Sequence, residues 1–400
     1  MPPDDDSPQK SFADILPKQP EPRAVPVKTF KAWHRPRKQY VRQFQWAKQI
    51  RNLIGMLHFS EDPKIFRYLS LPGNDLLDVR SIREACFSTG VVLKYVGLNF
   101  VDPESTDEIQ LNLARNDVNS LAGIHTQSTI LLEKFEAIAE KKSLAFAHVE
   151  SAGPYHCINV DLCNSVAAQS QSSPDPTHID AIGELLRLQI KMATQPWLLF
   201  LTTRVGSKYI NTRNLNALVN SIRVNTLHHT EFRGRIELMM RAKGEELSHK
   251  LQSVRTLPAK EFKDIFCVGF GKWLLSFLQT ARPRVEFINL ESYYYSVVPG
   301  KPDMVSLGYL CRPRVTLPKD PFHLIKDAAQ EHSLSEIEMA MTLLEVTQAM
   351  KNVDELLQAN TALNDSMIKE TEDLLRLASY AVDDSENGYR AWLQRGAPHQ

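Results

Sequence analysis

The sequence predicts an α/β protein with a doubly wound, mostly parallel sheet that ends in an antiparallel hairpin. Between residues 59 and 210, short apolar runs alternate with segments whose apolar residues recur at helical spacing. These segments are long enough to form crossover helices, so the strands they connect are predicted to be parallel. Two later apolar runs, 284–297 and 304–311, are separated only by the turn-forming stretch 299–303, so we expect them to be antiparallel neighbours.

The individual elements follow from their periodicity. Strand-like runs occupy 66–71, 91–99, about 128–132, 155–161 and 197–203. Helix-like segments lie between them, at 78–88, 107–122, 136–150 and 178–193. Gly90 is expected to close the first of these helices, because glycine readily adopts the left-handed conformation that follows a helix.

The remaining chain divides into flanking and inserted regions. Residues 1–27 are rich in proline and acids and are predicted to be a disordered tail. A basic aromatic helical arm is predicted at 28–58, before the Rossmann-like α/β core at 59–210. A helical insertion, the closing β-hairpin and a helical C-terminal region follow, at 211–280, 281–318 and 319–400.

The C-terminal region carries its own helix signals. Ser335 and Glu338 have the spacing of a capping box. An apolar stripe from Ile337 to Leu377 predicts a helical hairpin packed on the body, with a break between 356 and 364.

Composition excludes several classes of protein. Lys and Arg together number 47, as do Asp and Glu, so net charge indicates no partner. The five cysteines include no Cys-x-x-Cys pair, which argues against a structural zinc site or a disulfide framework. No signal peptide and no run of about 18 apolar residues is present. We therefore expect a cytoplasmic protein with no membrane partner.

The order of five β/α units followed by a closing hairpin resembles the class I SAM-dependent methyltransferase fold, over about residues 60–315. The resemblance implies S-adenosyl-L-methionine as cofactor, bound at the carboxyl ends of the strands. Its contacts would be Leu71 and Gly73 after the first strand, Asp78 just beyond, and Asn99 (or the slightly later Asp102) after the second. Asp78 also fits a helix-capping role.

Two features depart from the family pattern. Family members usually have two or three glycines after the first strand, whereas this chain has only Gly73 there. They usually place an acid after the second strand, where this chain has Asn99.

The end of the fourth strand is the candidate catalytic position. Residues 159–165 are similar to the loops with which nucleic-acid methyltransferases hold a base amino group. The resemblance implies that Asp161 accepts a hydrogen bond from the amine and that Asn164 orients it. Asp161 is equally consistent with a helix cap. Arg204, after the fifth strand, is predicted either to meet an anionic ligand or to lie on the surface.

Residues 28–51 carry the strongest partner signal, with eight Lys or Arg, no acid and five interleaved aromatic residues. Basic side chains neutralise phosphates and aromatic rings stack on unpaired bases, which indicates nucleic-acid binding. The same pattern fits a helix whose aromatic residues pack on the body. A lid over the cofactor cleft is a third interpretation.

Two functional hypotheses follow. The first is a SAM-dependent methyltransferase-like protein, a transferase that acts on or binds nucleic acid. The second is a catalytically inactive methyltransferase-fold interaction module, a pseudoenzyme in a multiprotein bacterial system, with a protein partner on its C-terminal helices. The glycine-poor loop around Gly73 favours the second.

Overall fold

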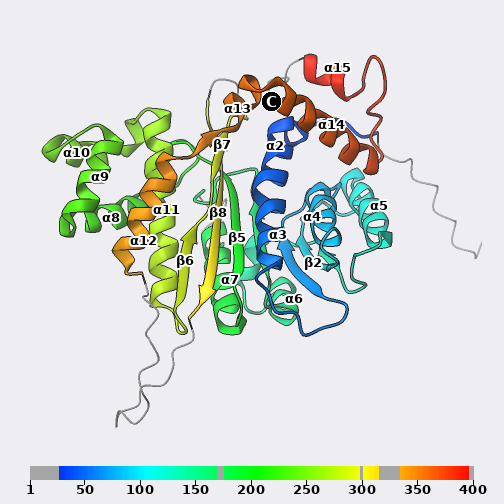
Figure 1. Cartoon of the computed structure of the whole chain (residues 1–400), viewed down its shortest axis with the longest axis horizontal. Helices are drawn as coiled ribbons and strands as arrows, with labels where there is room; N and C mark the ends of the chain where they lie inside the picture. The colour runs from blue at the N-terminus through cyan, green and yellow to red at the C-terminus, as the bar shows by residue number, and fades with distance from the viewer. Residues whose placement is uncertain (1–26, 169–174, 298–300, 315–333, 396–400) are drawn as a thin grey trace, which may run out of the picture.

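The computed structural model describes residues 27–168, 175–297, 301–314 and 334–395 (Figure 1). The predicted tail therefore lies outside the described residues, apart from its last position. The strands are β1 (Ile65–Ser70), β2 (Val92–Leu98), β3 (Thr129–Leu131), β4 (Cys157–Asp161), β5 (Trp197–Arg204), β6 (Val285–Asn289), β7 (Tyr293–Tyr295), β8 (Met304–Pro313) and β9 (Lys351–Asn352).

These strands form one Rossmann-like mixed sheet in the order β3-β2-β1-β4-β5-β8-β7-β9, with β6 also paired to β8. Strands β1 to β5 are parallel to their neighbours. Strand β8 runs antiparallel to β5 on one side and to β6 and β7 on the other. The predicted fold class is confirmed, including the antiparallel hairpin near the end of the sheet.

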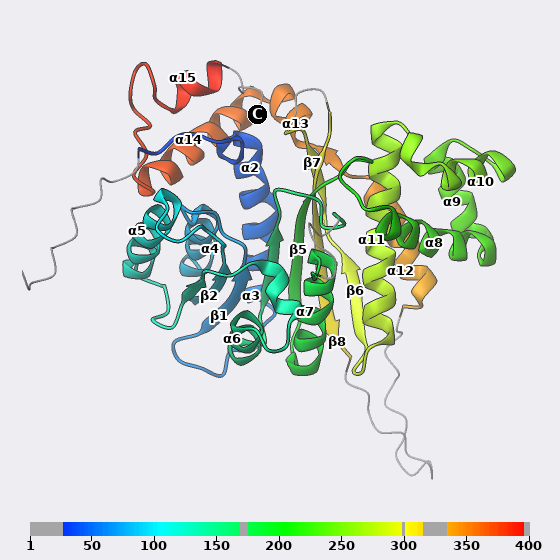
Figure 2. The same cartoon turned by 180° about the vertical axis from the view of Figure 1, so that it is seen from behind.

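The helices that precede or connect the parallel strands cover both faces of this sheet. They are α2 (Pro36–Val41), a π-helical segment η2 (Arg42–Ala47), α3 (Lys48–Ile54), α4 (Leu77–Phe87), α5 (Thr106–Ser120), η3 (Phe135–Ala139), α6 (Leu144–Ala152) and α7 (His178–Met192), with the short η1 (Ala32–His34) in front. Helices α3, α4 and α5 lie over one face, and α6 and α7 over the other (Figure 2).

Strand β5 shows why the sheet needs cover on both sides. Successive side chains of a strand point to opposite faces. Trp197, Leu199 and Leu201 accordingly belong to the core under α7, whereas Leu198 and Phe200 belong to the core under α3 and α4. A continuous apolar run is therefore the expected composition of a strand at the centre of a doubly wound sheet.

The closing hairpin differs from the single β run predicted at 284–297. The structure divides this run into β6 and β7, because residues 290–292 oppose only residues 307 and 308. This extra residue makes a bulge. The Gly308 amide donates to Ser292 Oγ at 3.2 Å, which satisfies the backbone where the ladder is interrupted.

The helical insertion projects from one end of the sheet (Figure 1). It contains α8 (Thr212–His228), α9 (Thr230–Met240), α10 (Gly244–Gln252), η4 (Val254–Thr256) and α11 (Ala259–Thr280). Helix α11 packs on α8 and continues the cover of the sheet over β6. No described helix is both long and apolar enough to cross a membrane.

The C-terminal region is not a helical hairpin. It contains α12 (Glu336–Gln348), α13 (Val353–Ala359), α14 (Thr361–Leu377) and α15 (Tyr389–Gln394). The predicted capping box of Ser335 and Glu338 is present at the start of α12. Helix α12 packs on α11, whereas α14 packs on α2 and α4 at the other side of the molecule. The short strand β9 separates them and pairs with β7, a tertiary contact that no local pattern indicates.

Candidate functional site

The carboxyl ends of β1, β2 and β4 are neighbours at the edge of the sheet below α2 and α14 (Figure 1). The strand order reverses between β1 and β4, and ligands of open α/β sheets bind at such a switch point. The predicted residues Leu71, Gly73 and Asn99 lie in the loops that leave this edge, and Asp161 ends β4. The structure thus brings the predicted set to one edge.

The loops after β1 and β2 are tied to each other. Asn99 Nδ2 donates to the Pro72 carbonyl at 2.9 Å and to Asn74 Oδ1 at 3.0 Å. The side-chain amide predicted to contact the cofactor is therefore engaged by the β1 loop. A β-carbon on exposed Gly73 would meet no atom within 4 Å, so no close approach requires glycine there.

A leucine provides the left-handed backbone of the β1 loop. Leu76 is fully buried and has φ 52° and ψ 35°, a conformation that costs a residue other than glycine about 1–2 kcal/mol. The buried apolar side chain offsets that cost by packing against the core under α4. The buried Leu76 side chain thus holds this turn in place. In a glycine-rich loop, by contrast, the backbone stays free to contact a ligand.

Asp75, in the same loop, is a buried residue that the sequence analysis did not identify. Its carboxylate accepts hydrogen bonds from Lys28 Nζ at 2.6 Å, Gln110 Nε2 at 2.8 Å and the Tyr380 hydroxyl at 2.6 Å. These donors come from the arm, from α5 and from the chain beyond α14. Because the partners are far apart in sequence, no spacing could have indicated the cluster.

Asp78 is used inside the protein. It lies in the first turn of α4, but its carboxylate accepts hydrogen bonds from Ser70 Oγ and, at 3.4 Å, from the Tyr68 hydroxyl. Asn159 Nδ2 in turn donates to the Tyr68 hydroxyl at 2.9 Å. Burial raises the pKa of Asp78, and the Ser70 hydrogen bond partly opposes this effect. Neither role predicted for Asp78, cofactor contact or helix cap, accounts for these contacts.

Asp161 is paired with the arm. Lys38 Nζ lies 2.6 Å from Asp161 Oδ1, and the side chains are 6% and 22% exposed. The Lys38 ammonium also lies 4.6 Å from the ring centroid of Trp46, whose π face stabilises a cation. Residues 162–168, which directly follow Asp161, form no helix, so Asp161 does not cap one and that interpretation is wrong.

The other predicted positions after β4 and β5 differ in their surroundings. Asn164 is exposed, and its backbone carbonyl accepts hydrogen bonds from the Arg204 amide and Thr203 Oγ1. Arg204 Nε lies 3.4 Å from Asp303 Oδ2, and its guanidinium lies 5.0 Å from the Tyr209 ring centroid. Arg204 is therefore held between neighbours.

The arm is packed into the body of the protein. Tyr40, Trp46 and Lys38 are buried. Gln45 Nε2 reaches the β6–β7 bulge, where it donates to the Glu291 carbonyl at 3.1 Å. Gln45 Nε2 donates to the Ser306 carbonyl at 2.9 Å, and Ser306 Oγ donates to Gln45 Oε1 at 2.6 Å. Packing of the arm aromatics, one of the three interpretations of residues 28–51, holds for Tyr40 and Trp46, whereas Trp33 and Phe44 are exposed. That basic side chains also point inward was not expected.

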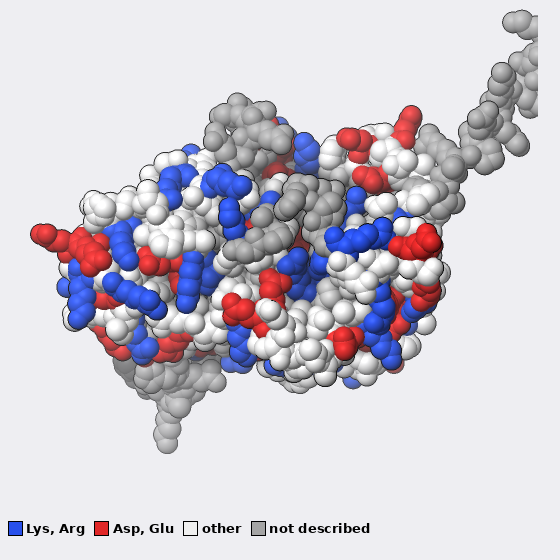
Figure 3. Space-filling view, turned by 90° about the horizontal axis from the view of Figure 1, so that it is seen from above, with Lys and Arg blue, Asp and Glu red and all other residues white. Residues whose placement is uncertain are grey.

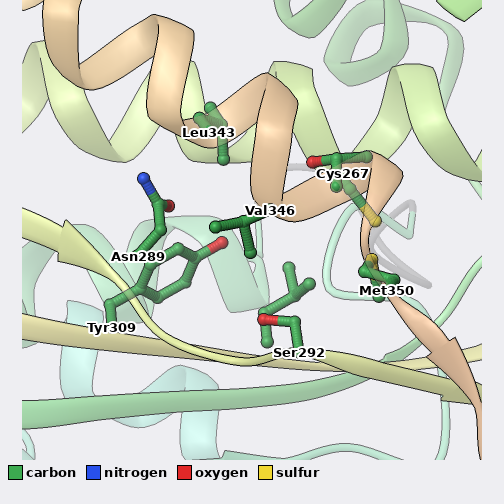
Figure 4. A pocket seen from close by; sticks show the side chains of 9 residues that line it. Cys267, Asn289, Ser292, Tyr309, Leu343, Val346 and Met350 are labelled. Atoms are coloured by element: carbon green, nitrogen blue, oxygen red, sulfur yellow. The ribbon is translucent and has the colours of Figure 1, made fainter.

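Two cavities among the described residues lie away from the carboxyl edge. One, of about 10 Å³, lies between α12 and the sheet and is lined by Cys267, Asn289, Tyr309, Leu343 and others (Figure 4). It is large enough for a single water molecule. The other, of about 100 Å³, lies at the opposite edge, beside His156 and Gln195. Small-molecule sites typically enclose about 300–1,000 Å³, so neither fits a cofactor as large as SAM.

No group of three or more metal-ligating side chains occurs among the described residues. The five cysteines are free thiols, and four of them are buried. Neither observation adds a metal or redox centre to the carboxyl edge.

Comparisons with known proteins identify a family for this chain. A crystal structure from Clostridium thermocellum, titled as a "putative rRNA-methylase", is similar at 8% identity and TM-score 0.30, covering 68% of this chain and 97% of that one. A likeness at this level supports no conclusion about function. A search of curated proteins finds no match. The sequence profile of the PP_RS20740-like family matches residues 27–394, and the chain therefore belongs to the PP_RS20740-like family.

Proposed function

We propose that this protein is a binding module with a methyltransferase-like fold that does not use SAM. The observation that carries the proposal is the Lys38–Asp161 ion pair, with 2.6 Å between Nζ and Oδ1. In the class I arrangement, the end of the fourth strand faces the methyl donor. Here the arm places an ammonium group at that position, and the carboxylate that would hold a substrate amine instead binds a lysine of the same chain.

Other polar groups at the carboxyl edge support the same proposal. Asn99 binds the β1 loop, and Asp78 binds Ser70. Asp75 receives three donors from other parts of the chain. Each of these polar groups is already hydrogen-bonded to another part of the protein. Binding of SAM would have to break these bonds without replacing them in kind.

Calorimetric titration of the full chain with SAM tests the proposal. We expect no binding at concentrations up to about 1 mM, the upper end of common substrate affinities. The Lys38→Met variant keeps the length and apolar stem of the side chain but removes the ammonium group. The matched control is Lys48→Met, at an exposed position of the same arm.

Binding of SAM to the wild-type protein, reduced by Asn99→Ala, would overturn the proposal. If only Lys38→Met binds SAM, the proposal stands in a stronger form, because the ion pair would then be what closes the cofactor site. Thermal unfolding of each variant shows whether it is folded before its titration is interpreted.

Methyl transfer is the second candidate, and one observation favours it. Asn164 is exposed next to the end of β4, where the resemblance places the group that orients a substrate amine. Such an enzyme would need the arm to move away, and catalysis would come mainly from positioning donor and acceptor. Transfer of a labelled methyl group from SAM to RNA or DNA, lost in Asn164→Ala, would establish it.

A further inference from the structure

Three residues of the arm, two adjacent ones before α2 and one at the start of η2, carry buried side-chain donors that have no hydrogen-bond partner among the described residues. They are His34 Nε2, Arg35 Nε and one terminal nitrogen of Arg35, and Nε and one terminal nitrogen of Arg42. His34 and Arg42 are 0% and 4% exposed. Buried charged donors are normally satisfied by an acceptor, so these groups are positioned to bind a ligand or an ordered water molecule.

His34 is a donor at this site. Its Nδ1 accepts from the Lys31 amide at 3.0 Å, so the proton of the neutral ring is on Nε2. Burial, followed by the positive charge of Arg42, lowers the pKa of His34 to about 3. The ring is therefore neutral near pH 7, and it adds a donor without adding charge.

The three residues flank helix α2. His34 and Arg35 precede it, Arg35 with an extended backbone, and Arg42 follows it as the first residue of η2. Tyr389 links the group, because its hydroxyl donates to the His34 carbonyl and the charges of both arginines act on its phenol. The Arg35 guanidinium lies 4.5 Å from the Trp392 ring centroid, which fixes its plane. Single π-helical turns of this kind occur often at functional sites.

The neighbouring acids do not neutralise these arginines by direct contact. Asp161 is paired with Lys38, and Asp78 accepts from Ser70. Among the described residues, no carboxylate lies within ion-pair distance of Arg35 or Arg42. The alternative is that Arg42 acts only as a distant counter-ion of Asp78 and Asp161, whose charges do act on it.

We propose that His34, Arg35 and Arg42 form a binding site for a terminal phosphate group. Guanidinium groups present paired donors that match phosphate oxygens, and a neutral imidazole N–H supplies a further donor. Because Arg42 and His34 are buried, the site fits the end of a ligand better than a continuous phosphodiester backbone. Arg35 is only partly buried, so this part of the group is accessible from solvent.

Seen from above, this end of the molecule carries basic and acidic side chains interspersed over its surface (Figure 3). The proposed site goes beyond the SAM-independent module proposed above and does not depend on it, since SAM carries no phosphate.

Calorimetric titration with a nucleoside 5′-monophosphate, with the matching nucleoside and with inorganic phosphate tests the site in the full chain. We expect the monophosphate to bind and the nucleoside not to bind. Arg42→Met should weaken binding about 10- to 100-fold, the range expected for losing charge-assisted hydrogen bonds. Arg42→Lys keeps the charge but loses the planar guanidinium group. Its affinity for the monophosphate should lie between those of the wild-type protein and Arg42→Met.

The matched control is Arg51→Gln, which removes an exposed positive charge from the same arm and should leave binding unchanged. Equal losses in Arg51→Gln and Arg42→Met would overturn the proposal in favour of non-specific attraction. Failure of every phosphate-bearing probe to bind the wild-type protein would also overturn it. Arg35→Gln, at a partly exposed position, serves as the second variant if Arg42→Met does not fold.

Thermal unfolding without phosphate separates the ligand site from the counter-ion alternative. If Arg42 is a ligand-binding residue, Arg42→Met should unfold at the same temperature as the wild-type protein or at a higher one, because an unpartnered buried charge has been removed. A clear decrease, with no effect on phosphate binding, would assign Arg42 to the counter-ion role. Titration with oligonucleotides that carry or lack a 5′-phosphate then shows whether the bound phosphate belongs to the end of a nucleic acid or to a free nucleotide.

Discussion

Single buried side chains of this protein have proton equilibria that couple its stability to pH. His156 precedes β4, and its Nδ1 accepts from the Arg67 amide at 3.0 Å. Its ring lies 5.3 Å from that of Phe66 and 5.8 Å from that of Phe59. Burial, and next the charge of Arg67, lower the pKa of His156 to about 4.

This shift predicts acid destabilisation. Below pH 6.5 the unfolded chain protonates this histidine, whereas the folded protein does not until about pH 4, so stability falls as pH decreases through that window. We expect His156→Gln, which retains an acceptor, to reduce the loss between pH 6.5 and 5 by about 1–2 kcal/mol. Urea unfolding at several pH values measures it. His228→Gln, on the exposed end of α8, is the control. An unchanged slope in His156→Gln would refute the assignment.

At the scale of elements, close helix packing depends on where glycines fall. A β-carbon on Gly269 of α11 would lie 2.8 Å from Leu218 Cβ and 3.0 Å from the Leu218 carbonyl oxygen. Helix α8 therefore approaches α11 as closely as it does because that position lacks a side chain. A β-carbon on Gly234 of α9, in contrast, would meet no atom within 4 Å.

The two glycines should respond to alanine in opposite directions. Gly269→Ala should lower the free energy of unfolding by about 1–3 kcal/mol, because it pushes α8 away from α11. Gly234→Ala should raise it by about 0.5–1 kcal/mol, because alanine is the better helix former. Chemical denaturation of both variants measures this contrast. Equal effects would mean that α8 is free to move on α11.

At the scale of the whole molecule, segments from both ends of the described chain cover the carboxyl edge. Helix α2 crosses that edge and α14 packs over α2. Lys28 joins the two, since its Nζ donates to Asp75 at 2.6 Å and to the Ala378 carbonyl at 2.7 Å. The buried Gln45–Ser306 hydrogen bond fixes the arm to β8 from below.

These contacts predict that the arm unfolds together with the sheet. Amide hydrogens of residues 36–54 should exchange as slowly as those of β1, and more slowly than those of the projecting α9 and α10. Native-state hydrogen exchange read by mass spectrometry measures this. Fast exchange across 36–54, slowed by added SAM, would instead indicate a lid and would favour the methyltransferase candidate.

Much of the fold could be predicted from the sequence because local patterns encode it. The apolar run Trp197–Thr203 has the composition of a strand covered on both faces, and the order of such runs predicts the sheet. Ser335 and Glu338 marked a helix start correctly, because a capping box is a contact between close neighbours. The split of 284–297 was missed, since the bulge depends on Ser292 meeting Gly308 across the ladder.

The candidate site was predictable only in its location. Strand ends placed Gly73, Asn99 and Asp161 at one edge, because parallel strands bring their carboxyl ends together. Lys38 was visible as one member of a basic run, but no periodicity indicates that it turns inward to Asp161, 123 residues away. The three donors of Asp75 come from equally distant parts of the chain.

The sequence by itself determined the elements, their order and the parallel core, because hydrophobic periodicity and turn residues act over a few positions. Only the tertiary structure decided what occupies the carboxyl edge. Ion pairs and buried hydrogen bonds form between residues that the fold brings together, and their energy depends on burial that no local pattern contains. The fold there brings Lys38 to Asp161 and leaves the donors of Arg42 without a partner.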